Sequence, residues 1–229
     1  MKAFILAGGL GTRLRERFGD LPKSLAPIGG RPFIARQLEW LARHGVRDAV
    51  VCAGHGAAAL EEAIGDGSRF ELKVAWSVEP EPLGTGGALW HARAHVSGPA
   101  LVVNGDTLVE CDPWVLERRR WEGGAWSTLA LYRVEDASSR GRVESREGRI
   151  ARFVEKDPQY RGPAWVNGGL YAFAPWVWRR LPAGPSSLER DVLPALAAEG
   201  RLTGLELPGT FWDIGTPAEW ARAEARFAS

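Results

Sequence analysis

The sequence has few cysteines and almost no net charge. Cys52 and Cys111 are the only cysteines among 229 residues, so neither a disulfide framework nor a zinc ligand set can be built from them. With 29 basic Lys and Arg residues against 28 Asp and Glu, the formal net charge is +1. Such a charge implies no general attraction to nucleic acid or to a membrane surface. We therefore expect a cytoplasmic protein with no nucleic-acid partner.

Long apolar runs are also missing. No run reaches the roughly 20 residues that span a membrane, and residues 2–7 have the pattern of a buried strand rather than of a signal peptide. The length allows one large α/β domain or two small ones. Because no stretch rich in Pro, Gly or Ser divides the chain, we expect a single domain over residues 1–229. We expect it to be a monomer or a homodimer.

The first half of the chain alternates between apolar strand patterns and helical patterns. Strands are predicted at residues 2–7, 48–53, 72–78 and 100–103, and helices at 33–44, 57–64 and 84–95. This alternation is typical of right-handed βαβ units. It predicts a Rossmann-like three-layer α/β/α fold around a mainly parallel mixed sheet.

After Asp112 the pattern changes. A helix is predicted at 113–121, strands at 127–134, 141–145, 150–154 and 165–173, and helices again at 187–199 and 217–227. Residues 145–149 contain a glycine between two strand patterns, which indicates a hairpin turn. We expect the second half to add an antiparallel extension to the same sheet and to close one side of a cleft.

A glycine-rich loop follows the first predicted strand. Gly8, Gly9 and Gly11 leave backbone N–H groups bare, so an anion can approach them. Arg13 and Lys23 add two positive charges nearby, and this combination is the chemistry of a phosphate site. The alternative, a simple connection between a strand and a helix, is less favoured because such a turn needs neither cation.

Two familiar phosphate motifs fit this loop poorly. The dinucleotide-binding fingerprint requires a third glycine where Leu14 stands. The P-loop requires a glycine directly before its Lys-Ser pair, and Pro22 stands there instead.

Two aspartates follow other strand patterns. Asp106 lies in the segment Asn104-Gly105-Asp106-Thr107, and Asp213 lies in Trp212-Asp213-Ile214-Gly215. Ligands of such sheets bind beyond the carboxyl ends of the strands, where two carboxylates and a substrate phosphate would form a Mg²⁺ site. The alternative is that each aspartate only caps a turn or a helix.

These segments resemble the sugar nucleotidyltransferase family, the pyrophosphorylases that make nucleotide sugars. The first motif of that family stands here as Gly8-Gly9-Leu10-Gly11-Thr12-Arg13 with Pro22-Lys23. The two aspartate segments are similar to its metal-binding segments. The strand end Val154-Glu155-Lys156 is similar to the part that holds the sugar 1-phosphate. Asn167-Gly168-Gly169 is similar to the lining of the sugar pocket. Gly141 matches a glycine that approaches the sugar, although Arg140 stands where the family usually has an aromatic residue.

The resemblance implies that a sugar 1-phosphate attacks the α-phosphorus of a nucleoside triphosphate and that pyrophosphate leaves. It implies that Arg13 holds the leaving pyrophosphate, Lys23 the α-phosphate and Lys156 the sugar phosphate, with Mg²⁺ bound by Asp106 and Asp213. The implied sugar-binding residues are Gly141, Glu155, Lys156, Asn167 and Gly168. The implied nucleotide-binding residues are Leu6, Ala7, Gly8, Gly9, Gly11, Thr12, Glu79, Glu81, Gly84, Thr85, Asn104 and Gly105.

The base and the sugar follow from finer features. A carboxylate only accepts hydrogen bonds, and guanine offers two adjacent donors, so Glu79 or Glu81 suits guanine better than uracil or thymine. The run from Leu21 to Phe33 resembles the short guanylyltransferases that act on D-glycero-D-manno-heptose 1-phosphate. A mannose-1-phosphate guanylyltransferase and a hexose enzyme that uses UTP or dTTP are alternatives. A non-catalytic nucleotide-sugar sensor is disfavoured because every charged residue of the implied site is present.

Overall fold

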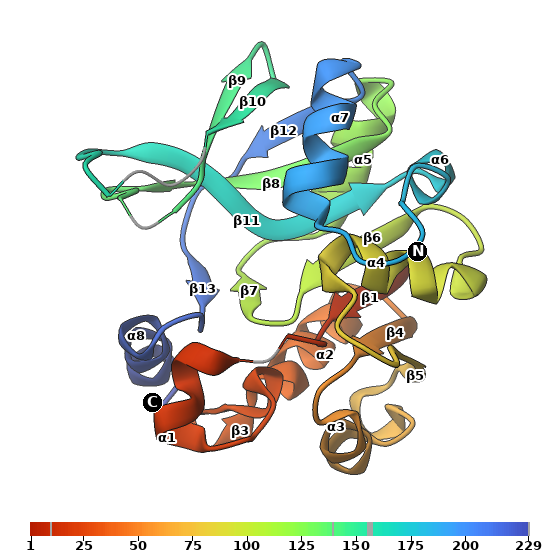
Figure 1. The fold of residues 1–229 in the computed structure, drawn as a ribbon, viewed down its shortest axis with the longest axis vertical. Coiled ribbons are helices and arrows are strands. Elements are labelled where there is room, and N and C mark those ends of the chain that lie inside the picture. Colours follow the sequence, from red (N-terminus) through yellow and green to blue (C-terminus); the bar gives the residue numbers. More distant parts are fainter. Residues whose placement is uncertain (10, 139, 155–157, 229) are drawn as a thin grey trace.

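The computed structural model describes residues 1–9, 11–138, 140–154 and 158–228. The described residues form a nine-stranded mixed sheet in the order β5-β4-β1-β6-β11-β8-β12-β10-β9 (Figure 1). Its strands are β1 (Lys2–Leu6), β4 (Asp48–Ala53), β5 (Lys73–Val78), β6 (Ala100–Asn104), β8 (Ser127–Val134), β9 (Arg142–Arg146), β10 (Arg149–Val154), β11 (Ala164–Phe173) and β12 (Leu202–Glu206). The predicted α/β fold class is confirmed.

Strand β1 lies in the middle of the parallel half of the sheet. It pairs in parallel with β4 on one side and β6 on the other, and β4 pairs in parallel with β5. Ala3 and Ile5 pack into the core on one face, and Phe4 packs into the core on the other. Burial on both faces explains why this strand is a continuous apolar run.

The antiparallel extension begins at β11. This strand runs antiparallel to both β6 and β8, and β9 and β10 form an antiparallel hairpin. Strand β12 runs parallel to β8 inside this extension, a pairing that the sequence patterns do not predict. Thr203 of β12 and Thr128 of β8 share a hydrogen bond of 2.6 Å between their buried hydroxyls.

Two short strands form a separate ladder beside the sheet. β7 (Thr107–Val109) pairs antiparallel with β13 (Phe211–Asp213), and Thr107 is opposite Asp213. Figure 1 shows the two strands side by side. Strands β2 (Pro27–Ile28) and β3 (Arg31–Pro32) form a second small ladder.

Helices cover both faces of the sheet. Side chains of α2 (Phe33–Arg43), α3 (Ala57–Ile64), α5 (Trp114–Glu122) and α8 (Pro217–Phe227) pack into one core, and side chains of α4 (Gly84–His91), α6 (Pro175–Trp178) and α7 (Leu193–Ala198) into the other. α1 (Arg15–Phe18) is a short exposed helix. Short helical turns are found at Thr12–Leu14, Lys23–Leu25, Ser68–Phe70, Ala92–His95 and Leu188–Val192. Among the described residues, no helix has both the length and the apolar character that crossing a membrane requires.

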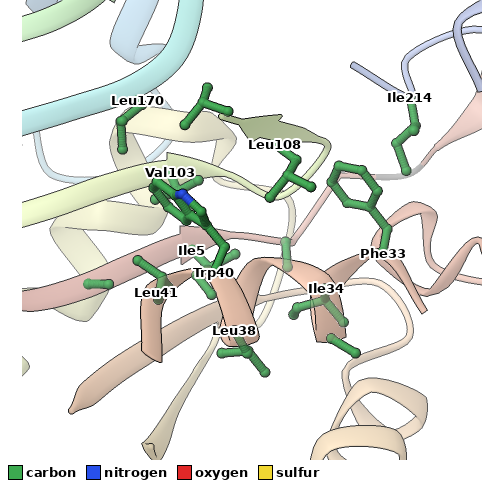
Figure 2. Close-up of a cluster of buried hydrophobic side chains, with 14 of the residues drawn as sticks. Ile5, Phe33, Ile34, Leu38, Trp40, Leu41, Val103, Leu108, Leu170 and Ile214 are labelled. Carbon is green, nitrogen blue, oxygen red and sulfur yellow. The ribbon is translucent and has the colours of Figure 1, made fainter. Parts of the chain in front are cut away.

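Helix α2 anchors the first of these cores. Figure 2 shows Ile34, Leu38 and Leu41 on this helix facing the apolar side chains that surround them, which include Ile5 and Val103 of the sheet. Each of the three helical side chains is fully buried. The helix therefore packs against the sheet through buried side chains.

We expect Leu41→Ala to lower the free energy of unfolding by about 2–5 kcal/mol, because it removes buried methyl groups and leaves a cavity. Chemical denaturation of both proteins measures this difference. A loss below about 1 kcal/mol would show that the core collapses around the smaller residue or that the packing of α2 is looser than described.

Candidate active site

A cavity of about 260 Å³ lies at the carboxyl ends of β1 and β6. The Gly105 N–H donates to the Leu6 carbonyl at 3.0 Å. A Cβ on Gly105 would lie 2.5 Å from that oxygen, so only glycine allows this approach. The cavity is lined by Leu6, Ala7, Gly8, Gly9, Lys23, Ser24, Glu79, Pro82, Gly84, Thr85, Ala88, Asn104, Gly105 and Asp106.

Most of the residues implied for nucleotide binding meet in this cavity. Gly11, Thr12 and Glu81 are not part of its lining. Ser24, Pro82 and Ala88 are, although no sequence feature singled them out. Each of these three is within a few residues of a motif, so closeness in sequence to a motif was the feature that could have predicted them.

Glu79 extends over the glycine loop. Its Oε2 accepts from the Leu83 N–H at 3.2 Å. Its Oε1 lies 2.5 Å from where a Cβ would stand on Gly8, and at the same distance from that point on Gly54. These two glycines leave the space that the carboxylate occupies. Gly54 was missed by the sequence analysis, although a glycine directly after a buried strand is a usable signal.

Burial raises the pKa of Glu79, and the hydrogen bond from the Leu83 N–H opposes this shift in part. A half-buried carboxylate that accepts a single backbone N–H retains lone pairs for a ligand. A ligand that donates two hydrogen bonds would stabilise the charged form and offset the desolvation.

The carboxylates of Asp106 and Asp213 each have a basic partner. Lys23 Nζ lies 2.5 Å from Asp106 Oδ2, and Arg140 Nη1 lies 3.0 Å from Asp213 Oδ2. A Cβ on Gly215 would stand 2.8 Å from Asp213 Oδ1 and 3.4 Å from Lys23 Nζ. The two aspartate segments and Lys23 therefore converge on one place, and the binding of a metal there by Asp106 and Asp213 stays a prediction.

This donor set fits a hard divalent cation that shares substrate oxygens. Within the part of the chain that the structure describes, no group of three or more His, Cys, Asp or Glu side chains could hold an ion. Two carboxylates at neighbouring strand ends, beside a loop suited to phosphate, match the way Mg²⁺ is bound by one or two carboxylates together with substrate phosphates.

A second cavity, of about 470 Å³, has Asp213 in its lining. It is lined by Arg13, Arg140, Gly141, Arg142, Val143, Phe153, Val154, Val166, Asn167, Glu189, Arg190, Asp213, Thr216 and Glu219. Gly141 and Asn167, which the family resemblance assigns to the sugar, are both in this lining. Arg13 lines this second cavity and not the first. Glu155 and Lys156 lie outside the described residues.

Gly168 is explained by backbone packing and Arg140 by ion pairing. A Cβ on Gly168 would lie 2.5 Å from the Tyr132 ring, so this glycine permits backbone packing and is not part of the cavity lining. Arg140 forms ion pairs with both Asp213 and Glu219, and its guanidinium lies 4.9 Å from the Phe211 ring centroid. It thus ties the segment before β9 to the start of α8.

A direct contact connects the two cavities. Thr85 Oγ1 donates to Glu189 Oε2 at 2.7 Å and accepts from the Leu188 N–H at 2.7 Å. The Gly86 N–H donates to the Ser186 carbonyl at 2.9 Å. Glu189 was missed because a glutamate in a predicted helix carries no local signal of a long-range partner.

The fold and these cavities define a Rossmann-like α/β protein with a glycine loop, a lysine and two carboxylates at its strand ends. The chain belongs to the Nucleotidyl transferase family, which it matches over residues 2–229. This match confirms the family that the sequence motifs indicated.

Two relatives illustrate the similarity. The chain is 36% identical over 226 residues to the mannose-1-phosphate guanylyltransferase catalytic subunit beta of Xenopus tropicalis, covering 96% of this chain and 62% of that protein. It is 35% identical over 236 residues to the mannose-1-phosphate guanyltransferase of Schizosaccharomyces pombe, covering 100% of this chain and 65% of that protein. The chain therefore spans less than two thirds of the length of these relatives.

Solved structures agree in fold. HddC from Yersinia pseudotuberculosis superimposes with a TM-score of 0.88 at 29% identity, covering 99% of both chains. Its complex with GMP-PN gives 0.86 at 28% identity, again covering 99% of both chains. A putative glucose-1-phosphate thymidylyltransferase from Bacillus anthracis gives 0.89 at 24% identity, covering 100% of this chain and 96% of that one. The last comparison supports the fold alone.

We expect Gly8→Ala to displace the Glu79 carboxylate, because the new Cβ would lie 2.5 Å from Oε1 at the end of a flexible side chain. The protein should stay folded, while its affinity for a nucleoside triphosphate should fall by about tenfold, or ~1.4 kcal/mol. Titration calorimetry measures the affinity and thermal unfolding checks the fold.

The control is the same substitution in a Glu79→Ala background, where the added cost should largely disappear. An equal loss of affinity in both backgrounds would mean that Gly8 acts through its own backbone and not through Glu79.

Proposed function

We propose that this chain transfers GMP from GTP to a sugar 1-phosphate and releases pyrophosphate. The observation that carries the proposal is a single cavity in which the glycine loop, Lys23, Asp106 and Glu79 meet. The Xenopus and Schizosaccharomyces relatives are named for guanylyl transfer, and the Yersinia structural neighbour has been solved with GMP-PN. A regulatory subunit would be free to lose at least one of these groups.

Glu79 is the residue that we propose reads the base. It lines the first cavity, whereas Glu81 does not. The two adjacent donors of guanine can both bond to one carboxylate, which makes a charge-assisted pair. Uracil and thymine have one donor flanked by carbonyl oxygens, and those oxygens would face the carboxylate unfavourably.

The reaction needs positioning and charge neutralisation more than covalent help from the protein. An oxygen of the sugar phosphate forms a bond to the α-phosphorus, and the bond from that phosphorus to the bridging oxygen of pyrophosphate breaks. The attacking phosphate is already ionised, so no general base is required. We assign Lys23 to the α-phosphate and Lys156 to the sugar phosphate from the sequence motifs.

We propose that Asp106 and Asp213 hold Mg²⁺, which when bound neutralises charge on the triphosphate. Asp106, which forms an ion pair with Lys23, would hold the metal through its carboxylate, and Lys23 would then be available to phosphate. Arg13 lines the second cavity together with Asp213, and we propose that it holds phosphate there.

The second cavity is the proposed sugar site, with Asn167 and Gly141 in its lining. We propose mannose 1-phosphate as the acceptor, because the most similar relatives described above are named for it. D-glycero-D-manno-heptose 1-phosphate is the second candidate. It is favoured by the resemblance of the run from Leu21 to Phe33 to the short heptose guanylyltransferases.

Pyrophosphate release should be fastest with GTP in a matrix of nucleoside triphosphates and sugar 1-phosphates. Glu79→Gln should erode that preference by about 10- to 100-fold and partly admit UTP or dTTP, since an amide both donates and accepts.

Because burial raises the pKa of Glu79, the carboxyl is more protonated in mildly acid solution. GTP binding should therefore strengthen as pH rises through that raised pKa.

Glu79→Gln is also the control for the pH effect, because GTP itself titrates while the amide does not. The part of the pH-dependent rise in GTP affinity that is absent from Glu79→Gln is due to the Glu79 carboxyl group. If the unmodified protein prefers UTP or dTTP, the guanine assignment is wrong and the nucleotidyltransferase assignment is unaffected.

Asp106→Asn should keep the fold but reduce turnover by about 10²-fold or more, the scale of losing a main charge-stabilising group. It should also weaken the stabilisation by Mg²⁺ and GTP in thermal unfolding. Asp48→Asn, at the exposed start of β4, is the matched control and should leave both quantities unchanged. Near-normal turnover of Asp106→Asn with metal still required would remove Asp106 from the site.

A further inference from the structure

Gln37 is a fully buried polar residue on the apolar face of α2. Figure 2 shows the apolar side chains Ile34, Leu38 and Leu41 of the same helix directed into the core. Burying an amide in such surroundings costs free energy unless its polar atoms are hydrogen-bonded. Packing alone therefore does not explain why a glutamine is buried at this position.

The amide of Gln37 bonds to both ends of the turn that carries Asp106. Nε2 donates to the Asn104 carbonyl at 2.8 Å and to the Thr107 carbonyl at 2.6 Å. The opposite orientation of the amide would turn its oxygen toward two carbonyl oxygens, so the nitrogen must face the turn. Oε1 has no hydrogen-bond partner among the described residues, so the donors account for the position of this side chain.

These two bonds satisfy a carbonyl group at each end of the turn from one amide nitrogen. A carbonyl group removed from water without a donor would be costly. Trp40, one helical turn further on, donates from its indole N–H to the Cys111 carbonyl at 3.1 Å. Helix α2 thus holds the segment after β6 at two separate points.

The backbone of this turn also positions the second carboxylate, that of Asp213. The Ile214 N–H donates to the Asp106 carbonyl at 3.0 Å, and Thr107 pairs with Asp213 across the β7–β13 ladder. A shift of the turn would therefore move both aspartates. Among the described residues that line the second cavity, none belongs to α2.

We propose that Gln37 is a positioning residue that fixes Asp106, and through the β7–β13 ladder Asp213, in the geometry that binds metal and phosphate. This inference rests on the proposed function of the two aspartates. Gln37 itself touches neither substrate nor metal. Its two N–H groups act by holding the backbone on either side of Asp106.

The test uses Gln37→Met, which keeps the length of the side chain and removes both donors. Binding of Mn²⁺ to the protein saturated with GTP is measured by titration calorimetry, together with the kinetics of pyrophosphate release. We expect Mn²⁺ affinity and kcat each to fall about 10- to 100-fold, the scale seen when a residue that orients a metal ligand is lost. KM for the sugar 1-phosphate should change less than twofold, because the second cavity is not altered.

Leu41→Ala is the matched control, since Leu41 is buried on the same helix and makes no bond to the turn. It should lower the unfolding temperature at least as much as Gln37→Met and yet leave Mn²⁺ affinity and kcat within about twofold at temperatures where it is folded. A merely structural role of Gln37 would make the two variants alike.

Gln37→Glu is a second variant, which keeps the shape and presents a carboxyl group to the two carbonyls. It should show the same loss of Mn²⁺ affinity, so the proposal can be judged even where the methionine variant fails to fold. Mn²⁺ affinity equal to that of the unmodified protein in either folded variant would overturn the inference. Asp106→Asn separates the two proposals: if it too binds Mn²⁺ normally, the proposed metal site is wrong.

Discussion

The pairing of β7 with β13 is the constraint on which the candidate site depends. Asp106 and Asp213 are far apart in sequence, and two carboxylates repel each other when they are brought together. The position of Thr107 opposite Asp213 in the β7–β13 ladder and the hydrogen bond from the Ile214 N–H to the Asp106 carbonyl hold them in place. Lys23 and Arg140 each neutralise one carboxylate, which lowers the cost of the arrangement in the absence of substrate.

The parallel half of the fold and the location of the site were predictable because both follow from local sequence. Strands buried on two faces are continuous apolar runs, and β1, β4 and β6 have this pattern. Glycines and polar residues directly after such runs mark the carboxyl edge of the sheet, where ligands bind. The first cavity forms at that edge from the residues that follow β1, β5 and β6.

What could not be predicted depends on contacts between distant segments. The space between Gly8 and Gly54 is filled by Glu79 only because β1, β4 and β5 are neighbours. Gln37 has the same spacing as the apolar positions of its helix, but a glutamine at one such position carries no sign of the turn that it meets. The sequence shows that Arg140 stands where the family usually has an aromatic residue, but it does not show that Arg140 pairs with Asp213 and Glu219.

The contact between Thr85 and Glu189 has a consequence for how two substrates would share the protein. Thr85 belongs to the first cavity and Glu189 to the second, and one hydrogen bond of 2.7 Å joins them. A ligand that drew Thr85 toward itself would also pull on an acceptor oxygen in the neighbouring cavity. By thermodynamic linkage, any change that a ligand in one cavity made to the affinity of the other would be returned by the same factor, and no movement of a domain would be needed.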